Sequence, residues 1–387
     1  MVTIPLVDSQ LVPPLVAKCI KRSSLNELGL AVLSHKVTIV MAPAGFGKSV
    51  WLASLQAVEG WPSTAWLSVE KYDNDPSFFL YHLIHALKKV EPQFGTQALH
   101  TLSSLNNLNR DWSIAASSLI EELPQNKELV VVLDDFHLVN KNVFVQGIIE
   151  YLIRRLPPQI HLVIMSRTDV TLNLYQELLK GQLLMFSGQK LLLTLAEVRE
   201  LFSLEGLNLS EEDNEFLYYY TEGWAAGVRL LGLFLKNSGS SDFKNLSLLE
   251  GKNCTLYTFL SNELLGYLTR ELHDFLLDSA LLPYLEPDLC NNVFEELGSK
   301  EKILELHALG LLSQVESHTT TWRFNHLMED FLRKKVTELR LPEYIKSLQH
   351  RAAAYLEKIG DIDRALEQLR ACRDWPKAAE LIVRYGD

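Results

Sequence analysis

The sequence predicts a multidomain protein in which an α/β domain with a parallel sheet precedes a largely helical half. Short apolar runs alternate with amphipathic stretches in the first half of the chain, a pattern typical of βαβ units. A glycine-rich loop ending in Gly-Lys-Ser follows the first of these runs. Strand patterns nearly vanish after about residue 193. The 387 residues are enough for roughly two to three domains.

The composition is that of a globular protein. Apolar residues make up 47% and charged residues 22% of the chain, which excludes wholesale disorder. The net charge of −11 argues against a surface devoted to nucleic acid. No apolar run approaches the ~18 residues of a membrane span, and no signal peptide pattern opens the chain. The four cysteines lie far apart, so no zinc or redox motif is predicted and a cytoplasmic location is expected.

Strands and helices alternate between residues 37 and 192. The predicted strands are β-branched or continuously apolar, as strands buried on both faces of a sheet are. They are Val37–Met41, Thr64–Val69, Leu129–Asp134 and His161–Ser166, with Leu183–Leu192 as a further candidate. The predicted helices between them are Lys48–Val58, Pro76–Val90, Trp112–Leu123 and Val143–Leu156. This alternation predicts a doubly wound parallel sheet.

A helical domain is predicted over residues 193–252. Thr194 and Glu197 have the spacing of a capping box, which begins a helix. Ser210 is a second N-cap. Trp224–Leu235 is a strongly apolar helix, and a loop of Gly and Ser follows it.

A winged helix and the start of a repeat array are predicted beyond the helical domain. Residues 253–340 indicate several helices followed by a hairpin, whose arms are Leu311–Val315 and Thr321–Phe324. Alanine-rich helical hairpins over residues 341–387 are typical of the first repeats of a TPR-like array. Such arrays need three or more repeats, so the chain is expected to be the front part of a longer protein.

Residues 42–49, Ala-Pro-Ala-Gly-Phe-Gly-Lys-Ser, carry the sharpest chemical signal. They follow a predicted strand and open a helix, which is the setting of a P-loop. Backbone N–H groups of such a loop bind phosphates, Lys48 would reach the β- and γ-phosphates, and the Ser49 hydroxyl would bind Mg²⁺. Ala42 stands where the pattern has its first glycine. The predicted ATP- or ADP-binding residues of the loop are Ala42, Pro43, Ala44, Gly45, Phe46, Gly47, Lys48, Ser49 and Val50.

Two further elements complete the predicted nucleotide site. The apolar strand Leu129–Asp134 ends in two carboxylates. Asp134 would hold Mg²⁺ through water, and Asp135 would orient or deprotonate the attacking water. Arg167 directly follows the strand His161–Ser166. Because the carboxyl ends of parallel strands line the nucleotide crevice, the Arg167 guanidinium is predicted to contact the γ-phosphate.

Several other polar side chains are interpreted as structural. His82 and His85 lie three residues apart on one predicted helix, with no acidic or Cys partner at ligand spacing, so packing is favoured over metal binding. His137 follows the second motif closely; a structural role is favoured, with a contact to the site as the alternative.

Six short segments spread over almost the whole chain share one resemblance. They are Met41–Ser49, Val132–His137, Met165–Arg167, Lys180–Leu184, Thr221–Gly227 and Arg323–Leu327. Together they resemble the ATPase part of MalT/LuxR-type regulators, which are large ATP-dependent bacterial transcription activators of the STAND class of signalling NTPases. The resemblance implies an arm (1–36), a nucleotide-binding domain (37–192), a helical domain, a winged helix and a repeat-based sensor.

The resemblance also implies a regulatory switch. ADP would hold a closed resting form, and ATP together with a small-molecule or protein inducer would open it and allow self-association. Hydrolysis would reset the switch with slow turnover. DNA would be bound only through a C-terminal region outside this chain.

Two nucleotide contacts are implied by the resemblance through position alone, and a third residue of the family is missing here. Arg22, in the basic motif of the arm, would approach the adenine. The winged-helix histidine that meets the ADP β-phosphate in the family corresponds to Asn325 or to His326. The adenine-contacting proline of the family is replaced by Ala225.

Alternative functions stay open from the sequence. One is a STAND-type signalling or immune NTPase whose effector does not bind DNA, and another is a P-loop remodelling ATPase with fast turnover. DNA binding by the winged helix itself is disfavoured, because residues 269–340 hold 8 basic and 13 acidic residues, a net charge of 8 − 13 = −5.

Overall fold

The computed structural model describes residues 8–15, 20, 22–105, 108–238, 268–309, 311–315 and 320–385. The chain divides into two compact units, Met1–Leu192 and Leu193–Asp387. Four sequence predictions lie outside the described residues. They are the loop at 239–241, the helical start of the winged-helix region at 253–267, the hairpin turn at 316–319, and the environments of Cys19 and Cys254.

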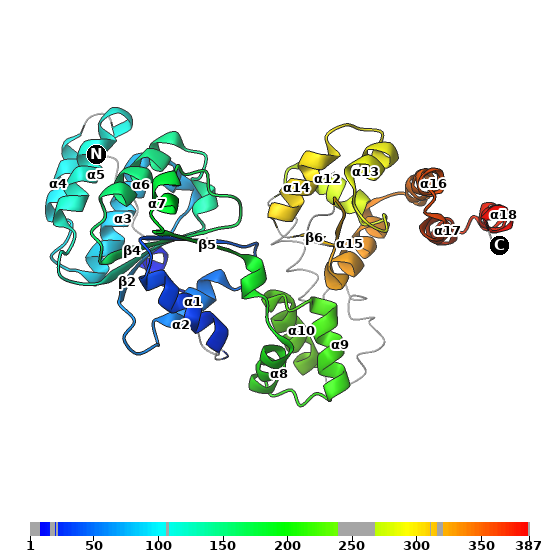
Figure 1. Cartoon of the computed structure of the whole chain (residues 1–387), viewed down its shortest axis with the longest axis horizontal. Helices are drawn as coiled ribbons and strands as arrows, with labels where there is room; N and C mark the ends of the chain where they lie inside the picture. The colour runs from blue at the N-terminus through cyan, green and yellow to red at the C-terminus, as the bar shows by residue number, and fades with distance from the viewer. Residues whose placement is uncertain are drawn as a thin grey trace. The chain divides into compact units, whose positions relative to one another are not determined.

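The first unit is built on a five-stranded parallel sheet with the strand order β2-β3-β4-β1-β5 (Figure 1). The strands are β1 (Val37–Met41), β2 (Ser63–Ser68), β3 (Leu129–Asp134), β4 (Ile160–Ser166) and β5 (Leu183–Ser187). Every residue of β3 and β4 is buried, because helices cover both faces of the sheet. The predicted α/β class with a parallel sheet is confirmed.

Helices pack on both faces of this sheet, with α1 and α2 on one side and α3, α5 and α6 on the other (Figure 1). The helices of the unit are α1 (Ser23–Leu33), α2 (Lys48–Leu55), α3 (Pro76–Val90), α4 (Thr96–Ser104), α5 (Leu108–Glu122), α6 (Val143–Arg155) and α7 (Tyr175–Leu179). Short 3₁₀ turns are η1 (Asp8–Leu11), η2 (Lys71–Asn74), η3 (Phe136–Leu138) and η4 (Gly188–Leu191). Local sequence sets the helix starts: Asp75 accepts from the Ser77 N–H at 2.7 Å, and Asn142 accepts from the Phe144 N–H at 2.9 Å.

Several elements of this unit differ from the prediction. The last strand ends at Ser187 rather than at residue 192, because Gly188 packs against Phe46 of the P-loop and the chain turns there into η4. Helices α1, α4 and α7 were not predicted, and α5 begins at Leu108, before the predicted start at Trp112. In α4 Ala98 is buried, and Leu99 and Leu102 are partly buried against the core.

The second unit is largely helical. Its first helices are α8 (Leu195–Leu204), α9 (Glu211–Thr221) and α10 (Ala225–Ser238). The winged-helix region contributes α12 (Arg270–Ser279), α13 (Pro287–Phe294), α14 (Ser299–Ala308), β6 (Ser313–Gln314), β7 (Trp322–Arg323) and α15 (His326–Leu339). It is followed by α16 (Pro342–Ile359), α17 (Ile362–Ala371) and α18 (Trp375–Tyr385). The capping box of α8 forms, with the Thr194 N–H donating to Glu197 Oε2 at 2.8 Å, and β6 pairs antiparallel with β7 as the winged-helix prediction requires.

Gly223 holds a left-handed position at the start of the second unit. Its φ is +74°, its carbonyl oxygen accepts from the Leu193 N–H at 2.8 Å, and a Cβ at this position would overlap the Leu193 carbonyl. Gly206 has a similar φ of +83° but open space around its Cα. We expect Gly206→Ala to lower the free energy of unfolding by about 1 kcal/mol, from backbone strain alone. Gly223→Ala should lower it by at least about 3 kcal/mol, because steric overlap adds to that strain.

Urea unfolding followed by circular dichroism measures both changes. Equal losses for the two variants would show that the backbone near Leu193 relaxes at no cost.

Candidate functional site

The loop between β1 and α2 has the backbone conformation of a P-loop. Gly45 and Gly47 have φ values of +78° and +84°, a region that glycine enters without steric cost. Lys48, the first residue of α2, is 6% exposed. Its Nζ donates to the carbonyl oxygens of Ala42 at 2.5 Å and of Pro43 at 3.0 Å. The loop therefore curves around the lysine side chain at the N-terminus of α2, where anions bind favourably.

The end of β3 brings two carboxylates beside the P-loop. Asp134 is 6% exposed, and its Oδ1 accepts from the Asp135 N–H at 2.9 Å. Burial raises the pKa of Asp134 to about 6, and the Asp135 charge adds to this rise, whereas a hydrogen bond from the Ser49 side chain and the Lys48 charge lower it. The two predicted Mg²⁺ ligands, Ser49 and Asp134, are therefore hydrogen-bonded neighbours. Hydroxyl and carboxylate oxygens are the ligands that Mg²⁺ prefers.

Lys48 shares the electrostatic field of the same carboxylates. Burial lowers the pKa of Lys48 to about 8, the charges of Asp134 and Asp135 raise it, and Arg167 lowers it. Residues at the carboxyl ends of β3 and β4 thus influence one ammonium group. The structure brings together the three motifs that the sequence predicted for the nucleotide site.

Arg167 and Asp135 form an ion pair at the carboxyl ends of β3 and β4. Arg167 Nε lies 3.3 Å from Asp135 Oδ1. Asp135 has a φ of +55°, a strained position for a residue with a side chain, and such strain gathers at functional sites. The predicted catalytic pair therefore sits on the side of the sheet that also holds the P-loop.

The structure shows that His137 lies in contact with the site. Its Nδ1 lies 3.6 Å from Asp135 Oδ1, and its side chain is 18% exposed. Burial lowers the pKa of His137 to about 4, although Asp135 raises it, and the charges of Arg167 and Lys48 lower it further. The imidazole is therefore neutral at pH 7. The sequence signal was its place two residues after Asp135.

The buried neutral state of His137 predicts a pH dependence of stability. Because its pKa is depressed on folding, the unfolded chain binds this proton more tightly, and the free energy of unfolding should fall as pH drops from about 6.5 toward 4. We expect His137→Gln to make this fall less steep. His100→Gln, at an exposed position, is the control and should leave the slope unchanged. Urea unfolding at pH 4.5 and at pH 7 measures how much the free energy of unfolding changes between these two pH values. An equal change in wild type and in His137→Gln would contradict the prediction.

The three residues carried over from the family resemblance have other partners in this structure. Arg22 donates from Nη1 to the Leu191 carbonyl oxygen at 2.9 Å and from Nη2 to the Leu192 carbonyl oxygen at 2.7 Å. Asn325 is the N-cap of α15, and its Oδ1 accepts from the Met328 N–H at 2.8 Å. His326 Nδ1 lies 3.6 Å from a Glu222 carboxylate oxygen. Nucleotide contacts of Arg22, Asn325 and His326 stay predictions.

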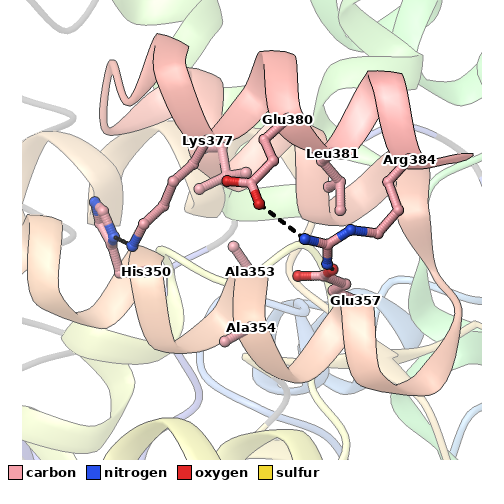
Figure 2. A pocket seen from close by; sticks show the side chains of 9 residues that line it. His350, Ala353, Ala354, Glu357, Lys377, Glu380, Leu381 and Arg384 are labelled. Carbon is pink, nitrogen blue, oxygen red and sulfur yellow. Dashed lines mark hydrogen bonds and ion pairs between the residues drawn. The ribbon is translucent and has the colours of Figure 1, made fainter. Parts of the chain in front are cut away.

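A second concave region lies between α16 and α18, with a volume of about 190 Å³ (Figure 2). Its charged side chains pair with one another. Arg384 donates to Glu357 at 2.7 Å and to Glu380 at 2.8 Å, and Lys377 Nζ lies 3.3 Å from His350 Nδ1. The positive charge of Arg384 in this groove is therefore already balanced by the carboxylates of Glu357 and Glu380. In the part of the chain that the structure describes, no group of three His, Cys, Asp or Glu side chains is placed to hold a metal ion.

Comparisons with known proteins show what this chain is similar to. The MalT winged helix domain matches residues 261–344. The HTH-type transcriptional regulator MalT of Serratia proteamaculans is 27% identical over 91% of this chain and 39% of its own length. The chain is MalT-like. The resemblance to MalT-type regulators that the sequence predicted is confirmed.

Two further similarities extend this result. The serine/threonine-protein kinase PknK of Mycobacterium tuberculosis is 26% identical over 94% of the MalT-like chain and 33% of its own length. A Walker-type ATPase of Pyrococcus abyssi has the same fold, with a TM-score of 0.50 and 14% identity over 80% of this chain and 94% of that one. The chain thus spans 33% and 39% of the length of these two curated relatives. No helix within the described ranges is long and apolar enough to cross a membrane.

Proposed function

We propose that this chain is a regulatory module that binds ATP and ADP with Mg²⁺ and hydrolyses ATP slowly. The observation that carries the proposal is the convergence of Lys48, the Ser49–Asp134 pair and the Asp135–Arg167 pair on one side of the parallel sheet. Ligands bind at the carboxyl ends of the strands in open sheets of this kind. The similarity to MalT, which is named a transcriptional regulator, supports regulation as the purpose of the site.

Each site residue has a distinct role in this proposal. The P-loop N–H groups and Lys48 bind the β- and γ-phosphates. Ser49 and Asp134 hold Mg²⁺, which supplies positive charge that offsets the charge developing on the phosphates. Asp135 orients the attacking water and accepts its proton, and Arg167 stabilises the γ-phosphoryl charge.

The wider switch belongs to the same proposal. ATP and an inducer would favour self-association, and ADP would restore the resting form, with Asn325 or His326 reaching a phosphate. We propose a cytoplasmic location and DNA binding only through a region outside this chain. The similarity to PknK, which is named a protein kinase, favours a second candidate, in which the same type of module regulates an effector that does not bind DNA.

The nucleotide that co-purifies with the protein tests the proposal directly. Native mass spectrometry should find ADP or ATP bound at one per chain, and steady-state turnover should be slow. Fast turnover would favour the remodelling ATPase, and a chain that neither retains nor binds nucleotide would contradict the proposal.

We expect this chain alone not to bind duplex DNA specifically at physiological salt. The net charge of −11 removes the attraction to phosphates that dominates such binding. Fluorescence anisotropy with labelled promoter DNA at two salt concentrations measures this. Salt-sensitive, saturable binding that unrelated DNA fails to compete would contradict the expectation.

A further inference from the structure

The Arg22 side chain forms hydrogen bonds to the backbone that follows β5. Its guanidinium donates to two consecutive carbonyl oxygens, those of Leu191 and Leu192, which lie 169 and 170 residues away in sequence. The backbone carbonyl of Arg22 itself accepts from the Leu25 and Asn26 N–H groups at the start of α1. A planar guanidinium that bonds two fixed acceptors is a geometrically specific contact that lysine does not reproduce.

The gripped segment also forms a wall of the P-loop. A Cβ at Gly188 would lie 2.8 Å from the Phe46 ring and 3.0 Å from the Ala42 side chain, so the loop and this segment are in close contact. Leu191 is fully buried and belongs to the same apolar cluster as Ala42 and Trp51 of α2. A displacement of the P-loop therefore acts directly on the segment 188–192.

The same segment ends where the second unit begins. Leu192 is the last residue of the first unit. Leu193, the next residue, donates its N–H to the Gly223 carbonyl at 2.8 Å within the second unit. Two consecutive residues are thus held in different units. Leu192 is bonded to Arg22 in the first unit, and Leu193 is bonded to Gly223 in the second unit.

We propose that Arg22 is a positioning residue that clamps the segment 188–192 against the P-loop and so transmits the state of the P-loop to the first residues of the second unit. The clamp itself depends only on contacts within the first unit. Its response to nucleotide rests on the proposed function.

Tryptic cleavage after Lys190 reports on the clamp. Lys190 is exposed, and a protease must pull the residues that follow it into an extended conformation, which the two bonds from Arg22 oppose. We expect Arg22→Ala to accelerate this cut at least 10-fold and Arg22→Lys to accelerate it less. Arg154→Ala is the control, because it removes an arginine from an exposed pair with Glu150 on α6. Mass spectrometry quantifies the cut, and thermal unfolding shows that each variant is folded.

Nucleotide provides the second arm of the experiment. ADP with Mg²⁺ should slow the cut in wild type and should slow it much less in Arg22→Ala. Cleavage at the wild-type rate in Arg22→Ala overturns the clamp. Loss of the preference for adenine at an unchanged cleavage rate also overturns it, because Arg22 would then act on the base. If ADP slows the cut after Lys190 equally in wild type and in Arg22→Ala, the proposed transmission to the second unit is wrong.

A wild-type chain that binds no nucleotide would refute the proposed function and the transmission. Faster cleavage of Arg22→Ala would still support the clamp in that case, so the two failures are distinguishable.

Discussion

Replacing Lys48 by alanine is expected to weaken the binding of both ATP and ADP at least about 100-fold. The Lys48 ammonium is buried at the start of α2, with its Nζ inside the curve of the P-loop. In the proposed complex it bonds to phosphate oxygens, and one or two hydrogen bonds between charged groups are worth about 3 kcal/mol, which corresponds to this loss. Isothermal titration calorimetry with each nucleotide measures the effect.

Lys36 offers a matched control for this experiment. It lies immediately before β1, at the opposite end of the strand that leads into the P-loop, and Lys36→Ala removes the same charge. We expect the affinity of this variant to stay within about twofold of wild type, because Lys36 is half-buried at the far end of β1 and the length of this five-residue strand, roughly 16 Å, separates its charge from the P-loop. Unchanged affinity of Lys48→Ala for both nucleotides would refute the P-loop assignment.

Replacing Asp135 by asparagine is expected to slow ATP hydrolysis about 100-fold and to preserve ATP binding. The carboxamide keeps the shape of the side chain but accepts no proton, and general base catalysis commonly contributes two orders of magnitude or more. The ion pair with Arg167 is also weakened, so part of the loss arises from a displaced guanidinium. Single-turnover hydrolysis, with ATP affinity measured in parallel, separates the chemical step from binding.

Asp169→Asn is the control for the loss of a negative charge near the site. Asp169 is exposed and lies two residues beyond Arg167. Its substitution should leave both the single-turnover rate and the affinity unchanged. If Asp135→Asn hydrolyses ATP at the wild-type rate, the water-orienting role belongs to another residue.

Most of the first unit could be predicted from the sequence because its strands are buried on both faces and therefore carry continuous apolar runs. The central strands β1, β3 and β4 coincide with their predictions to within a residue. Helices α1, α4 and α7 were not predicted, and β5 ends at Ser187, where the following Gly188 lies against Phe46 of the P-loop. The contact between Gly188 and Phe46 joins residues that are distant in sequence.

The candidate site was predictable for a related reason. The P-loop, the two carboxylates after β3 and Arg167 are each encoded in a few consecutive residues, and parallel strands carry such segments to one edge of a sheet. The contact of His137 with Asp135 needed the turn η3, which bends the chain back toward the site.

The sequence alone determined the α/β class, the P-loop and the MalT-like resemblance, because these are written in local spacing and apolar pattern. Only the tertiary structure decided which backbone atoms Arg22 binds and that burial depresses the pKa of His137. The physical reason is that a hydrogen bond between side chain and distant backbone leaves no periodic trace. Leu191 and Leu192 accept hydrogen bonds from Arg22 through their backbone carbonyl oxygens. Every residue type has such an oxygen, so the identity of these two residues could not predict the contact.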